Sequence, residues 1–484
     1  MKIQLVTKPL SEISSDVIVI PVFEGVHEVT KLEVAQSFLK ANPKFGKELQ
    51  NQLILSKDKY ILLLGMGKKE KFNFEKLQNW AGAAVKNSKD KKGITLFMPD
   101  TDQISSEKMG EAVALGIEIG AYDPSKNYKS SYEEPKLINV EILVERADRA
   151  YQEGLKKGIT IAEGINLART LGDMPPNQMT PTYFLGIAQK VAKDNKLKIT
   201  FLDEKKAKKI GMGAFTGVAQ GSDEPSFMIA IEYKGDYRSK DVYGLVGKGI
   251  TFDTGGISIK PSSSMHEMKY DMAGAADVLA AIMVASKLGL KTNIVAVMAV
   301  TENLPGGRAQ RPGDIVKTYS GKTAEIIDTD AEGRLVLIDA VSYAQKDFKA
   351  NKIIDLATLT GAIIVALGDN IAGAFGNDSV FTQKLVEIGK VVGEKIWEMP
   401  MDEEFEEMIK SDLADIANLG RGGSHRSAAG SSTGAKFIEA GIEKGNKWIH
   451  LDIAGVAWDM KKKSFRAIGA TGWGIKTLVE LVSS

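Results

Sequence analysis

Three clusters of charged side chains between positions 248 and 334 contain the residue types that metal chemistry requires. They are Lys248 with Asp253, Lys260 with Asp271, and the trio Asp330, Glu332 and Arg334. Their carboxylates are the oxygen donors that hard divalent cations prefer. The trio stands among small residues in the run Asp328-Thr329-Asp330-Ala331-Glu332-Gly333-Arg334-Leu335. This setting, with a guanidinium alongside, indicates a metal site rather than a solvated acidic surface.

The charges of these residues suggest how many metals there are. Four carboxylates gathered without cations would repel one another and raise their own pKa values. Two divalent cations would neutralise the four negative charges, so a two-metal site is the simplest interpretation. Lys248 could join as a nitrogen ligand only as a neutral amine, whereas Lys260 would stay cationic and polarise a substrate carbonyl. Alternatively, each lysine is a surface charge and Asp271 is a helix cap.

Other chemistries have less support. The chain has no cysteine, which excludes disulfides, thiolate ligands and a cysteine nucleophile. Its four histidines stand in neither an H-E-x-x-H nor a G-x-S-x-G setting, and His450 is expected in the core; they are His27, His266, His425 and His450. The Gly-rich run 247–256 matches neither phosphate-loop spacing, so nucleotide binding is disfavoured.

Composition describes an ordinary globular protein. The chain has 484 residues, of which 43% are hydrophobic and 26% charged, and its formal net charge is +1. That balance gives no general electrostatic reason to bind nucleic acid or an anionic membrane. No stretch approaches the roughly 20 apolar residues of a membrane span, and the N-terminus has no signal-like apolar run. The cytoplasm is therefore the expected compartment.

The elements that must position the clusters form two α/β domains. We predict an N-terminal α/β domain over 1–150, a linker helix over 151–172 that ends before Pro175-Pro176, and a second α/β domain over 173–484. The first domain has strand patterns at 2–6, 17–21, 60–65, 94–98 and 138–144 and a helical pattern at 74–86.

All three clusters lie in the second domain. Its strand patterns are at 198–202, 227–233, 242–246, 293–300, 353–356 and 448–451, and its helical patterns are at 277–288, 335–346 and 384–397. The run 247–256 is expected as a loop at the carboxyl end of a strand, where ligand sites of α/β sheets concentrate.

Several of these motifs resemble the leucyl aminopeptidase family, the di-zinc cytosol aminopeptidases. Residues 329–335 match the family signature N-T-D-A-E-G-R-L, and Asp328 stands in place of its Asn. Further similar segments are 248–256, 258–261, 268–272, 311–314, 355–362 and 450–455, and 175–177 with 180–181 upstream. The resemblance runs from about Asn166 to the end. It implies a smaller, macro-domain-like N-terminal domain with a regulatory or oligomerisation role, and a larger catalytic domain with a mixed sheet flanked by helices.

The resemblance also implies roles for particular residues. Metal ligands would be Lys248, Asp253, Asp271, Asp330 and Glu332, the catalytic pair would be Lys260 and Arg334, and substrate would contact Met268, Thr358, Leu359, Gly361 and Ala454. A bicarbonate held at the arginine would shuttle protons. The two metals would be Zn or Mn, with Mg or Co possible, and the substrate's free α-amino group would bind one of them.

The implied protein is a metal-dependent aminopeptidase that releases Leu-like and other N-terminal residues from peptides, assembled as a homohexamer. A relative of the same fold that only binds DNA or peptides is the alternative. The completeness of the ligand set favours the enzyme. Ala457 is a small residue at another pocket position, which leaves the side-chain preference open. Asp328 either caps a turn, which we favour, or adds a further negative charge to the metal site.

Overall fold

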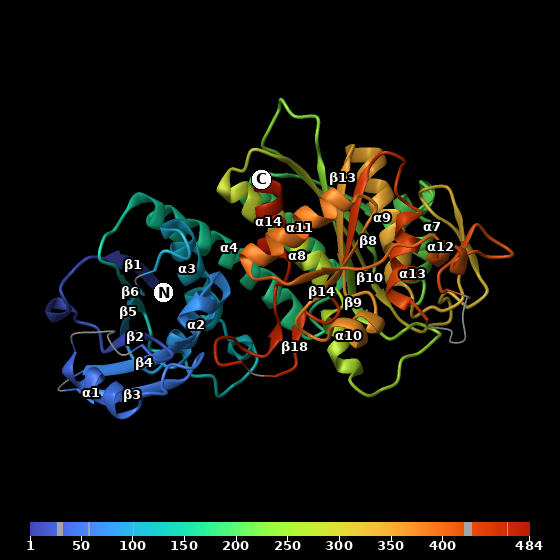
Figure 1. Cartoon of the computed structure of the whole chain (residues 1–484). Helices are drawn as coiled ribbons and strands as arrows, with labels where there is room; N and C mark the ends of the chain where they lie inside the picture. The colour runs from blue at the N-terminus through green and yellow to red at the C-terminus, as the bar shows by residue number, and fades with distance from the viewer. Residues whose placement is uncertain (27–31, 57–58, 100, 421–427, 462) are drawn as a thin grey trace. The chain divides into compact units, whose positions relative to one another are not determined.

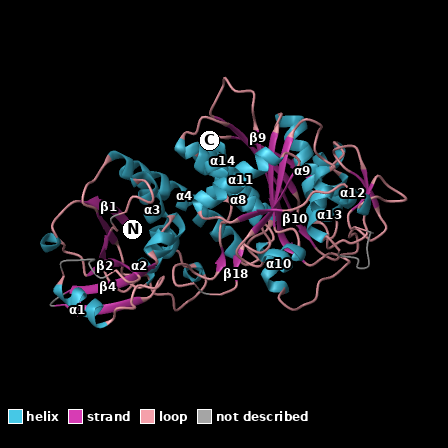
Figure 2. Ribbon diagram, viewed as in Figure 1, coloured by secondary structure: helices cyan, strands magenta, loops and turns pink. Residues whose placement is uncertain are grey.

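The computed structural model describes residues 1–484 apart from 27–31, 57–58, 100, 421–427 and 462. The chain divides into two units, each with strands enclosed by helices (Figures 1 and 2). One comprises Met1–Asn166 with Met460–Ile468, and the other comprises Leu167–Asp459 with Gly469–Ser484. Among the described residues, no helix combines the length and the apolar character needed to cross a membrane.

The first unit is built on a six-stranded sheet with the order β1-β6-β5-β2-β4-β3. Its strands are β1 (Lys2–Val6), β2 (Val17–Phe23), β3 (Asn51–Ser56), β4 (Lys59–Gly67), β5 (Gly93–Phe97) and β6 (Asn139–Leu143). Neighbours are parallel except β3 and β4. The sequence patterns do not predict β3, because its side chains are mostly exposed at the sheet edge and lack a buried period-two pattern.

Helices of the first unit are α1 (Glu33–Ala41), α2 (Phe74–Lys86) and α3 (Ser106–Ala121), with short 3-10 turns η1 (Leu10–Glu12), η2 (Lys69–Lys71) and η3 (Pro124–Asn127). Helix α2 has the predicted bounds because Asn73 caps it by accepting from the amide of Lys76 at 3.0 Å. It packs closely on α3, since a Cβ at Gly116 would lie 2.1 Å from the carbonyl oxygen of Gln78.

A long helix, α4 (Arg149–Asp173), continues from the first unit into the second, and the units divide within it, between Asn166 and Leu167. The sequence patterns also predict a helix here. They give no indication that Met460–Ile468 groups with the first unit. That short segment connects the two paired strands β18 (Trp458–Asp459) and β19 (Gly469–Ala470). Hydrophobic periodicity describes local structure only, so it cannot reveal that a later segment of the chain groups with the first unit.

The second unit is built on an eight-stranded sheet with the order β15-β14-β17-β13-β9-β10-β8-β7. The strands are β7 (Lys198–Asp203), β8 (Phe227–Lys234), β9 (Tyr243–Asp253), β10 (Asn293–Asn303), β13 (Lys352–Ala357), β14 (Ala372–Gly376), β15 (Ile396–Glu398) and β17 (Lys447–Asp452). The four central strands β17, β13, β9 and β10 run parallel, while β14, β8 and β7 pair in the antiparallel sense. The predicted mixed sheet is confirmed.

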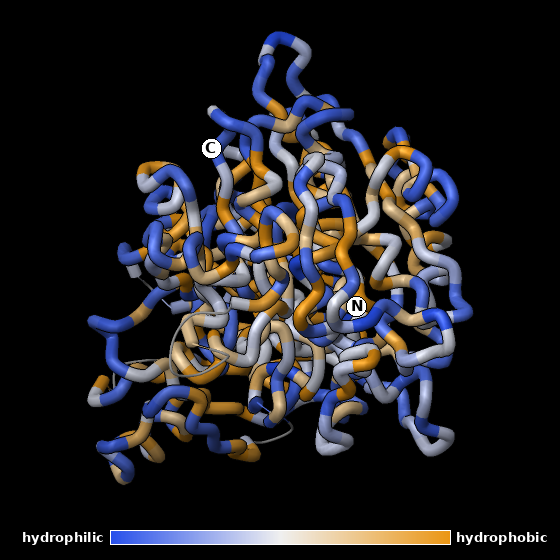
Figure 3. The backbone as a smooth tube through the Cα atoms, turned by 90° about the vertical axis from the view of Figure 1, so that its right-hand side faces the viewer, coloured by the Kyte–Doolittle hydropathy of each residue, from blue (hydrophilic) through white to orange (hydrophobic). Residues whose placement is uncertain are grey.

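Helices cover both faces of this sheet, with α8 (Ala273–Leu288) on one and α9 (Gly333–Phe348) on the other (Figure 1). The others are α5 (Pro181–Asp194), α6 (Glu204–Lys209), α7 (Gly213–Ala219), η4 (Met265–Tyr270), α10 (Gly361–Leu367), α11 (Ser379–Val392), α12 (Glu404–Met408), α13 (Gly430–Glu439) and α14 (Ile475–Ser483). A small sheet joins β11 (Ile315–Lys317), β12 (Thr323–Glu325) and β16 (Ile416–Ala417). Hydrophobic residues run through the interior of the unit, and hydrophilic residues occupy its peripheral loops (Figure 3).

Some sequence predictions in this unit are wrong at their ends. The helix expected over 384–397 stops earlier, because α11 ends at Gly393 in a left-handed conformation and Trp397 belongs to β15. The loop expected at 247–256 is mostly strand, because β9 continues to Asp253. Within the strand, Gly247 serves close packing, because a Cβ there would lie 2.5 Å from the Cα of Ala275 on α8. Gly255 and Gly256 come after the strand and have positive φ values of 86° and 67°.

The close packing of α8 on the sheet predicts that a methyl group at Gly274 is not tolerated. A Cβ there would lie 2.1 Å from the carbonyl oxygen of Leu356 on β13. Gly274→Ala should therefore lower the free energy of unfolding by about 1–3 kcal/mol, as overpacked cores do. Gly186→Ala in α5 is the matched control, because a Cβ there meets nothing within 4 Å. It should raise stability by up to about 1 kcal/mol through helix propensity. Denaturant midpoints of the two variants that shift in the same direction would contradict this account.

Candidate functional site

The carboxyl ends of the central parallel strands bring polar residues to one edge of the larger sheet. Asp253 ends β9, Asn303 ends β10, Thr358 follows β13 and Asp452 ends β17. Because parallel strands end at the same edge, residues that are distant in sequence meet there. The predicted location of the site at a strand end is correct, although the strand concerned ends later than the pattern suggests.

Lys248 lies inside β9, and its side chain is only 4% exposed. Its Nζ is 2.8 Å from Asp271 Oδ2 and 2.8 Å from Glu332 Oε1, and it donates to the carbonyl oxygen of Thr358 at 2.9 Å. The interpretation of Lys248 as a surface charge is therefore wrong. A buried amine in contact with two carboxylates is a basic group that belongs to the cluster.

Lys260 completes the cluster from the other side. Its Nζ lies 2.7 Å from Asp253 Oδ2 and forms a second ion pair with Asp330. The side chain is 21% exposed, so its ammonium group is more accessible than that of Lys248. The structure thus brings four acidic and two basic residues together: Lys248, Asp253, Lys260, Asp271, Asp330 and Glu332.

Asp271 and Glu332 stand beside helix N-termini without capping them. Met272 occupies the N-cap position of α8, while Asp271 accepts hydrogen bonds from Lys248 at 2.9 Å and from the Thr358 hydroxyl at 2.6 Å. Glu332 occupies the N-cap position of α9, but its side chain accepts no capping hydrogen bond. The helix-cap interpretation of Asp271 is therefore wrong, because its carboxylate is committed to the cluster.

The donor set fits divalent cations. Carboxylate oxygens of Asp253, Asp330 and Glu332 all lie within 4.8 Å of one another. Within the described part of the chain, neither carboxylate oxygen of the buried Glu332 accepts a hydrogen bond, although Oε1 is close to Lys248. Buried oxygens with unused lone pairs, gathered from several carboxylates, are what hard cations bind.

Burial dominates the electrostatics of the cluster. Loss of solvent, together with the neighbouring carboxylates, raises the pKa of Asp330 to about 7 and also raises the pKa values of Asp271 and Glu332. Burial by itself would lower the pKa of Lys248. The attraction of Asp271, Glu332 and Asp253 outweighs it and raises that pKa instead. Lys260 behaves in the same way, so both lysines are ammonium ions among these carboxylates.

Arg334 lies in the first turn of α9 and is buried. Its Nη1 donates to the carbonyl oxygen of Asn418 at 2.9 Å, while its Nε has no hydrogen-bond partner among the described residues. A Cβ at Gly434 would lie 3.1 Å from Nη2, so the guanidinium packs against the backbone of α13. Burial lowers the pKa of Arg334 to about 10, which leaves it cationic at neutral pH and able to hold an anion.

The carboxylate of Asp328 caps a turn. Its Oδ1 accepts from the amide of Asp330 at 2.9 Å, which is the Asx-turn geometry that an asparagine side chain also adopts. The main chain of Asp328 is held by Asn418. This geometry matches the turn-capping interpretation of the position where the family signature has Asn.

The predicted substrate residues lie around the same strand ends. Thr358 bonds to Asp271, and the amides of Leu359 and Ala454 both donate to Asp452 Oδ1, at 3.1 and 3.3 Å. The carbonyl oxygen of Met268, in η4, accepts from the amide of Asp271. Gly361 begins α10, and a Cβ there would meet no atom within 4 Å. Ala457 is almost fully buried.

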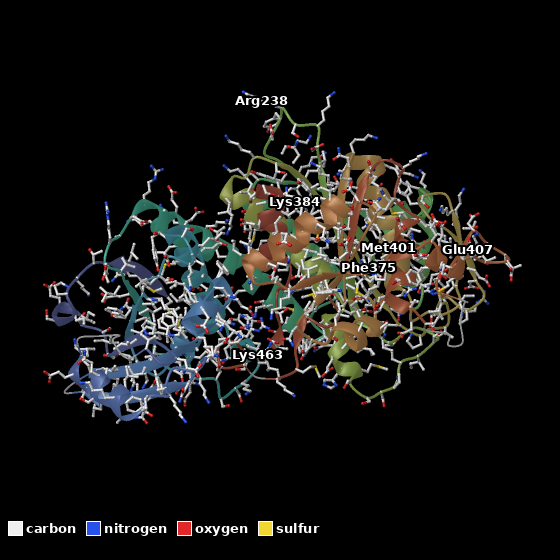
Figure 4. The ribbon with its side chains drawn as sticks, viewed as in Figure 1. Arg238, Phe375, Lys384, Met401, Glu407 and Lys463 are labelled. Carbon is white, nitrogen blue, oxygen red and sulfur yellow. The ribbon has the colours of Figure 1, made fainter. Side chains whose placement is uncertain are left out.

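The described histidines form no nucleophilic system with the cluster. His450 is fully buried, its Nδ1 lies 2.6 Å from Asp355 Oδ1, and its ring stacks on the buried Phe375, which is labelled in Figure 4. The expectation of a core residue is confirmed, although its Nε2 finds no partner in the described part of the chain. His266 is exposed, and His27 and His425 lie outside the described residues.

No role is assigned from the sequence to three buried residues at the site: Asn303, Asn418 and Asp452. Asn303 donates to Asp253 Oδ1 at 2.8 Å and fixes that carboxylate. Asn303 ends β10. Because ligand sites concentrate at the carboxyl ends of parallel strands, a correct prediction of that strand's end could have identified it. Asp452 lies within a quoted motif, but Asn418 has no pattern in its sequence context that indicates its role.

Comparisons with known proteins place this site in a family. Residues 166–479 match the catalytic domain of the cytosol aminopeptidase family, and residues 46–131 match its N-terminal domain. A probable cytosol aminopeptidase of Rickettsia bellii is 41% identical over 431 residues, which cover 88% of this chain and 85% of that protein. A probable cytosol aminopeptidase of Alkaliphilus oremlandii is 38% identical, and the alignment covers 100% of this chain and 99% of that protein.

Solved structures agree with these relatives. A mutant of tomato leucine aminopeptidase is 30% identical, with a TM-score of 0.89 over 100% of this chain and 96% of its own. The bottromycin maturation enzyme BotP, also solved in complex with Mn, is 28% identical, with a TM-score of 0.86 over 97% and 99% of the two chains. The chain therefore belongs to the cytosol aminopeptidase family and is a metal-dependent hydrolase that releases residues from the N-termini of peptides.

Proposed function

We propose that the chain holds two divalent cations with Lys248, Asp253, Asp271, Asp330 and Glu332 and uses them to hydrolyse N-terminal peptide bonds. Lys248 is an ammonium ion in the metal-free cluster and would become a ligand by giving up its proton when a cation binds. The observation that carries this proposal is that four carboxylates and the buried amine of Lys248 cluster at the ends of parallel strands. When bound, such cations supply Lewis acidity, which acidifies a water molecule and polarises the scissile carbonyl. Zn or Mn are the proposed metals, with Mg or Co possible, and the Mn complex of BotP supports a divalent cation.

Lys260 is the residue that we propose stabilises the oxyanion of the substrate. Its ammonium group is held by Asp253 and Asp330 and remains partly exposed, so it can reach a substrate carbonyl at the edge of the cluster. Its raised pKa keeps the proton in place, and a fixed positive charge stabilises the oxyanion that develops during attack. Because that charge is aimed by two carboxylates before the substrate arrives, little reorganisation accompanies the reaction.

Arg334 is the proposed holder of the proton carrier. Its guanidinium is buried and cationic, and its Nε is unused by any described residue, which suits a small planar anion such as bicarbonate. Arg334 would hold a bicarbonate beside the cluster, and that anion would supply the proton transfer that the reaction requires. Such a carrier supplies the general base in a site where no described histidine touches the carboxylates.

Met268, Thr358, Leu359, Gly361 and Ala454 are the proposed substrate contacts. Their small or apolar side chains favour Leu-like N-terminal residues, and one methylene more or less changes binding by only about 1–3 kcal/mol, so a broad preference is expected.

By analogy with the family, we propose a cytoplasmic homohexamer. Strongly exposed apolar side chains such as Val365 and Val380 suit an assembly with further copies.

Hydrolysis of leucine p-nitroanilide tests the proposed reaction directly. The full chain should release p-nitroaniline, lose that activity in excess chelator and regain it on addition of Mn(II) or Zn(II). Glu332→Gln should weaken metal binding and activity by about 10–100-fold or more, because it removes a charge from the cluster. Glu407→Gln, at an exposed ion pair with Lys410, is the control and should leave both unchanged. Hydrolysis that does not depend on metal, or no hydrolysis at all, would refute the proposal.

Metal affinity should rise with pH through neutrality. The pKa of Asp330 is raised to about 7, so this carboxyl carries a proton below that pH, and a cation must displace it. Above pH 7 the proton is already lost and the cation binds without that competition. Calorimetric Mn(II) titrations on either side of pH 7 should show tighter binding and fewer released protons at the higher pH. An affinity that is flat or falls with pH would contradict this assignment.

Asp328→Asn should leave activity within a few-fold. An asparagine oxygen can accept the same hydrogen bond from the amide of Asp330, so the turn is preserved. Steady-state kinetics with leucine p-nitroanilide provide the measurement, and Asp328→Ala, which removes the cap, is the informative partner variant. A loss of more than about a hundredfold in Asp328→Asn would show that the carboxylate acts on the metals instead.

A further inference from the structure

Asn418 is a fully buried residue just after β16, and its side chain makes four hydrogen bonds to one short turn. Its Oδ1 accepts from the amides of Ile327 and Asp328 at 2.7 and 3.3 Å. Its Nδ2 donates to the carbonyl oxygens of Asp328 and Ala331 at 2.6 and 3.3 Å. A primary amide offers two donor hydrogens and two acceptor lone pairs, so the turn uses all of them.

The turn that Asn418 holds is the one that carries the acidic residues. Asp330 lies within it, and Glu332 follows as the N-cap residue of α9. Residues 327–331 form no strand or helix, so their main-chain groups need other partners. Asn418 supplies these partners on both sides of Asp328, and the position of the Asp330 carboxylate therefore depends on an amide outside the cluster.

The main chain of Asn418 is fixed as well, and it reaches Arg334. Its amide donates to the carbonyl oxygen of Glu325 at 2.9 Å, which extends the pairing of β12 with β16. Its carbonyl oxygen accepts from Arg334 Nη1 at 2.9 Å. One residue, anchored on a small sheet, thus holds the Asp330 turn through its side chain and the guanidinium through its backbone.

We propose that Asn418 is a positioning residue that sets the metal-binding turn and Arg334 in register with each other. This inference rests on the proposed function, because it assumes that Asp330 is a metal ligand and that Arg334 serves the reaction. Neutrality matters in this position: an amide both donates and accepts, whereas a carboxylate can only accept. Partners of this kind behind metal ligands typically alter metal affinity or activity by about 10–100-fold when they are changed.

Asn418→Asp in the full chain is the sharpest test. The substitution preserves shape but places an oxygen against the carbonyl oxygens of Asp328 and Ala331, in place of a donor. Mn(II) affinity, titrated into metal-depleted protein, should fall by about 10–100-fold. The kcat for leucine p-nitroanilide should fall in a similar proportion while KM changes little, because Asn418 makes no contact with the predicted pocket residues Met268 or Ala454 in the bonds described.

Gln345→Glu is the matched control. Gln345 is also buried, and its amide also makes four bonds: Nε2 donates to Val341 and Gly441, and Oε1 accepts from Glu443 and Asn446. It lies on the same helix as Arg334 but about 16 Å further along it. Gln345→Glu should lower thermal stability as Asn418→Asp does, yet leave Mn(II) affinity and the ratio of kcat to KM unchanged.

The outcomes are distinct. Equal Mn(II) affinity in Asn418→Asp and Gln345→Glu, or losses that simply follow thermal stability in both, would overturn the proposal. If Asn418→Asp does not fold, Asn418→Ser retains a hydroxyl donor and acceptor, and its comparison with Gln345→Ser decides the same question. Because metal titration requires no turnover, an inactive wild-type chain would refute the proposed reaction while still testing the role of Asn418.

Discussion

The structure depends on the neutralisation of four carboxylates at the edge of one sheet. Asp253, Asp271, Asp330 and Glu332 lie close together, and two lysines contact them at ion-pair distances. An unpaired charge is very costly to bury, whereas a paired charge is tolerated when its geometry is good. The cluster meets this requirement, because each of its four carboxylates has a lysine at ion-pair distance.

Close packing brings these groups together. Lys248 emerges from within β9, and the lack of side chains at Gly247 and Gly274 allows α8 to approach the strands that carry it. Gly333 plays the same part at the start of α9, where a Cβ would lie 2.8 Å from Cε of Lys248. The packing of helices on strands thus depends on Gly247, Gly274 and Gly333.

Neutral amides and hydroxyls then fix the carboxylates of Asp253 and Asp271 and the turn that carries Asp330. Asn303 holds Asp253, the Thr358 hydroxyl holds Asp271, and Asn418 holds the turn of Asp330. Groups behind metal ligands orient them and tune their basicity, and neutral donors do so without changing the net charge of the site. Adding further lysines instead would have neutralised the site and left nothing for a cation to bind.

Much of this protein can be predicted from its sequence. The central strands have β-rich patterns, α2 has a helical pattern, and the proposed ligand residues stand in motifs that resemble those of the family. These features are local, because hydrophobic period, capping and residue type are all written within a few positions. Edge strand β3 and the return of Met460–Ile468 to the first unit are not local, and the patterns do not reveal them.

By itself, the sequence determined the α/β class, the acidic clusters and the membership of a metal-dependent aminopeptidase family. Only the tertiary structure decided that Lys248 is buried within a strand rather than exposed in a loop, that Asp271 faces the cluster rather than a helix end, and that Asn418 supports it. The physical reason is that burial and hydrogen-bond partners depend on contacts between segments distant in the chain. Asn418 meets Asp328 only because β16 pairs with β12, and no spacing along the sequence records that pairing.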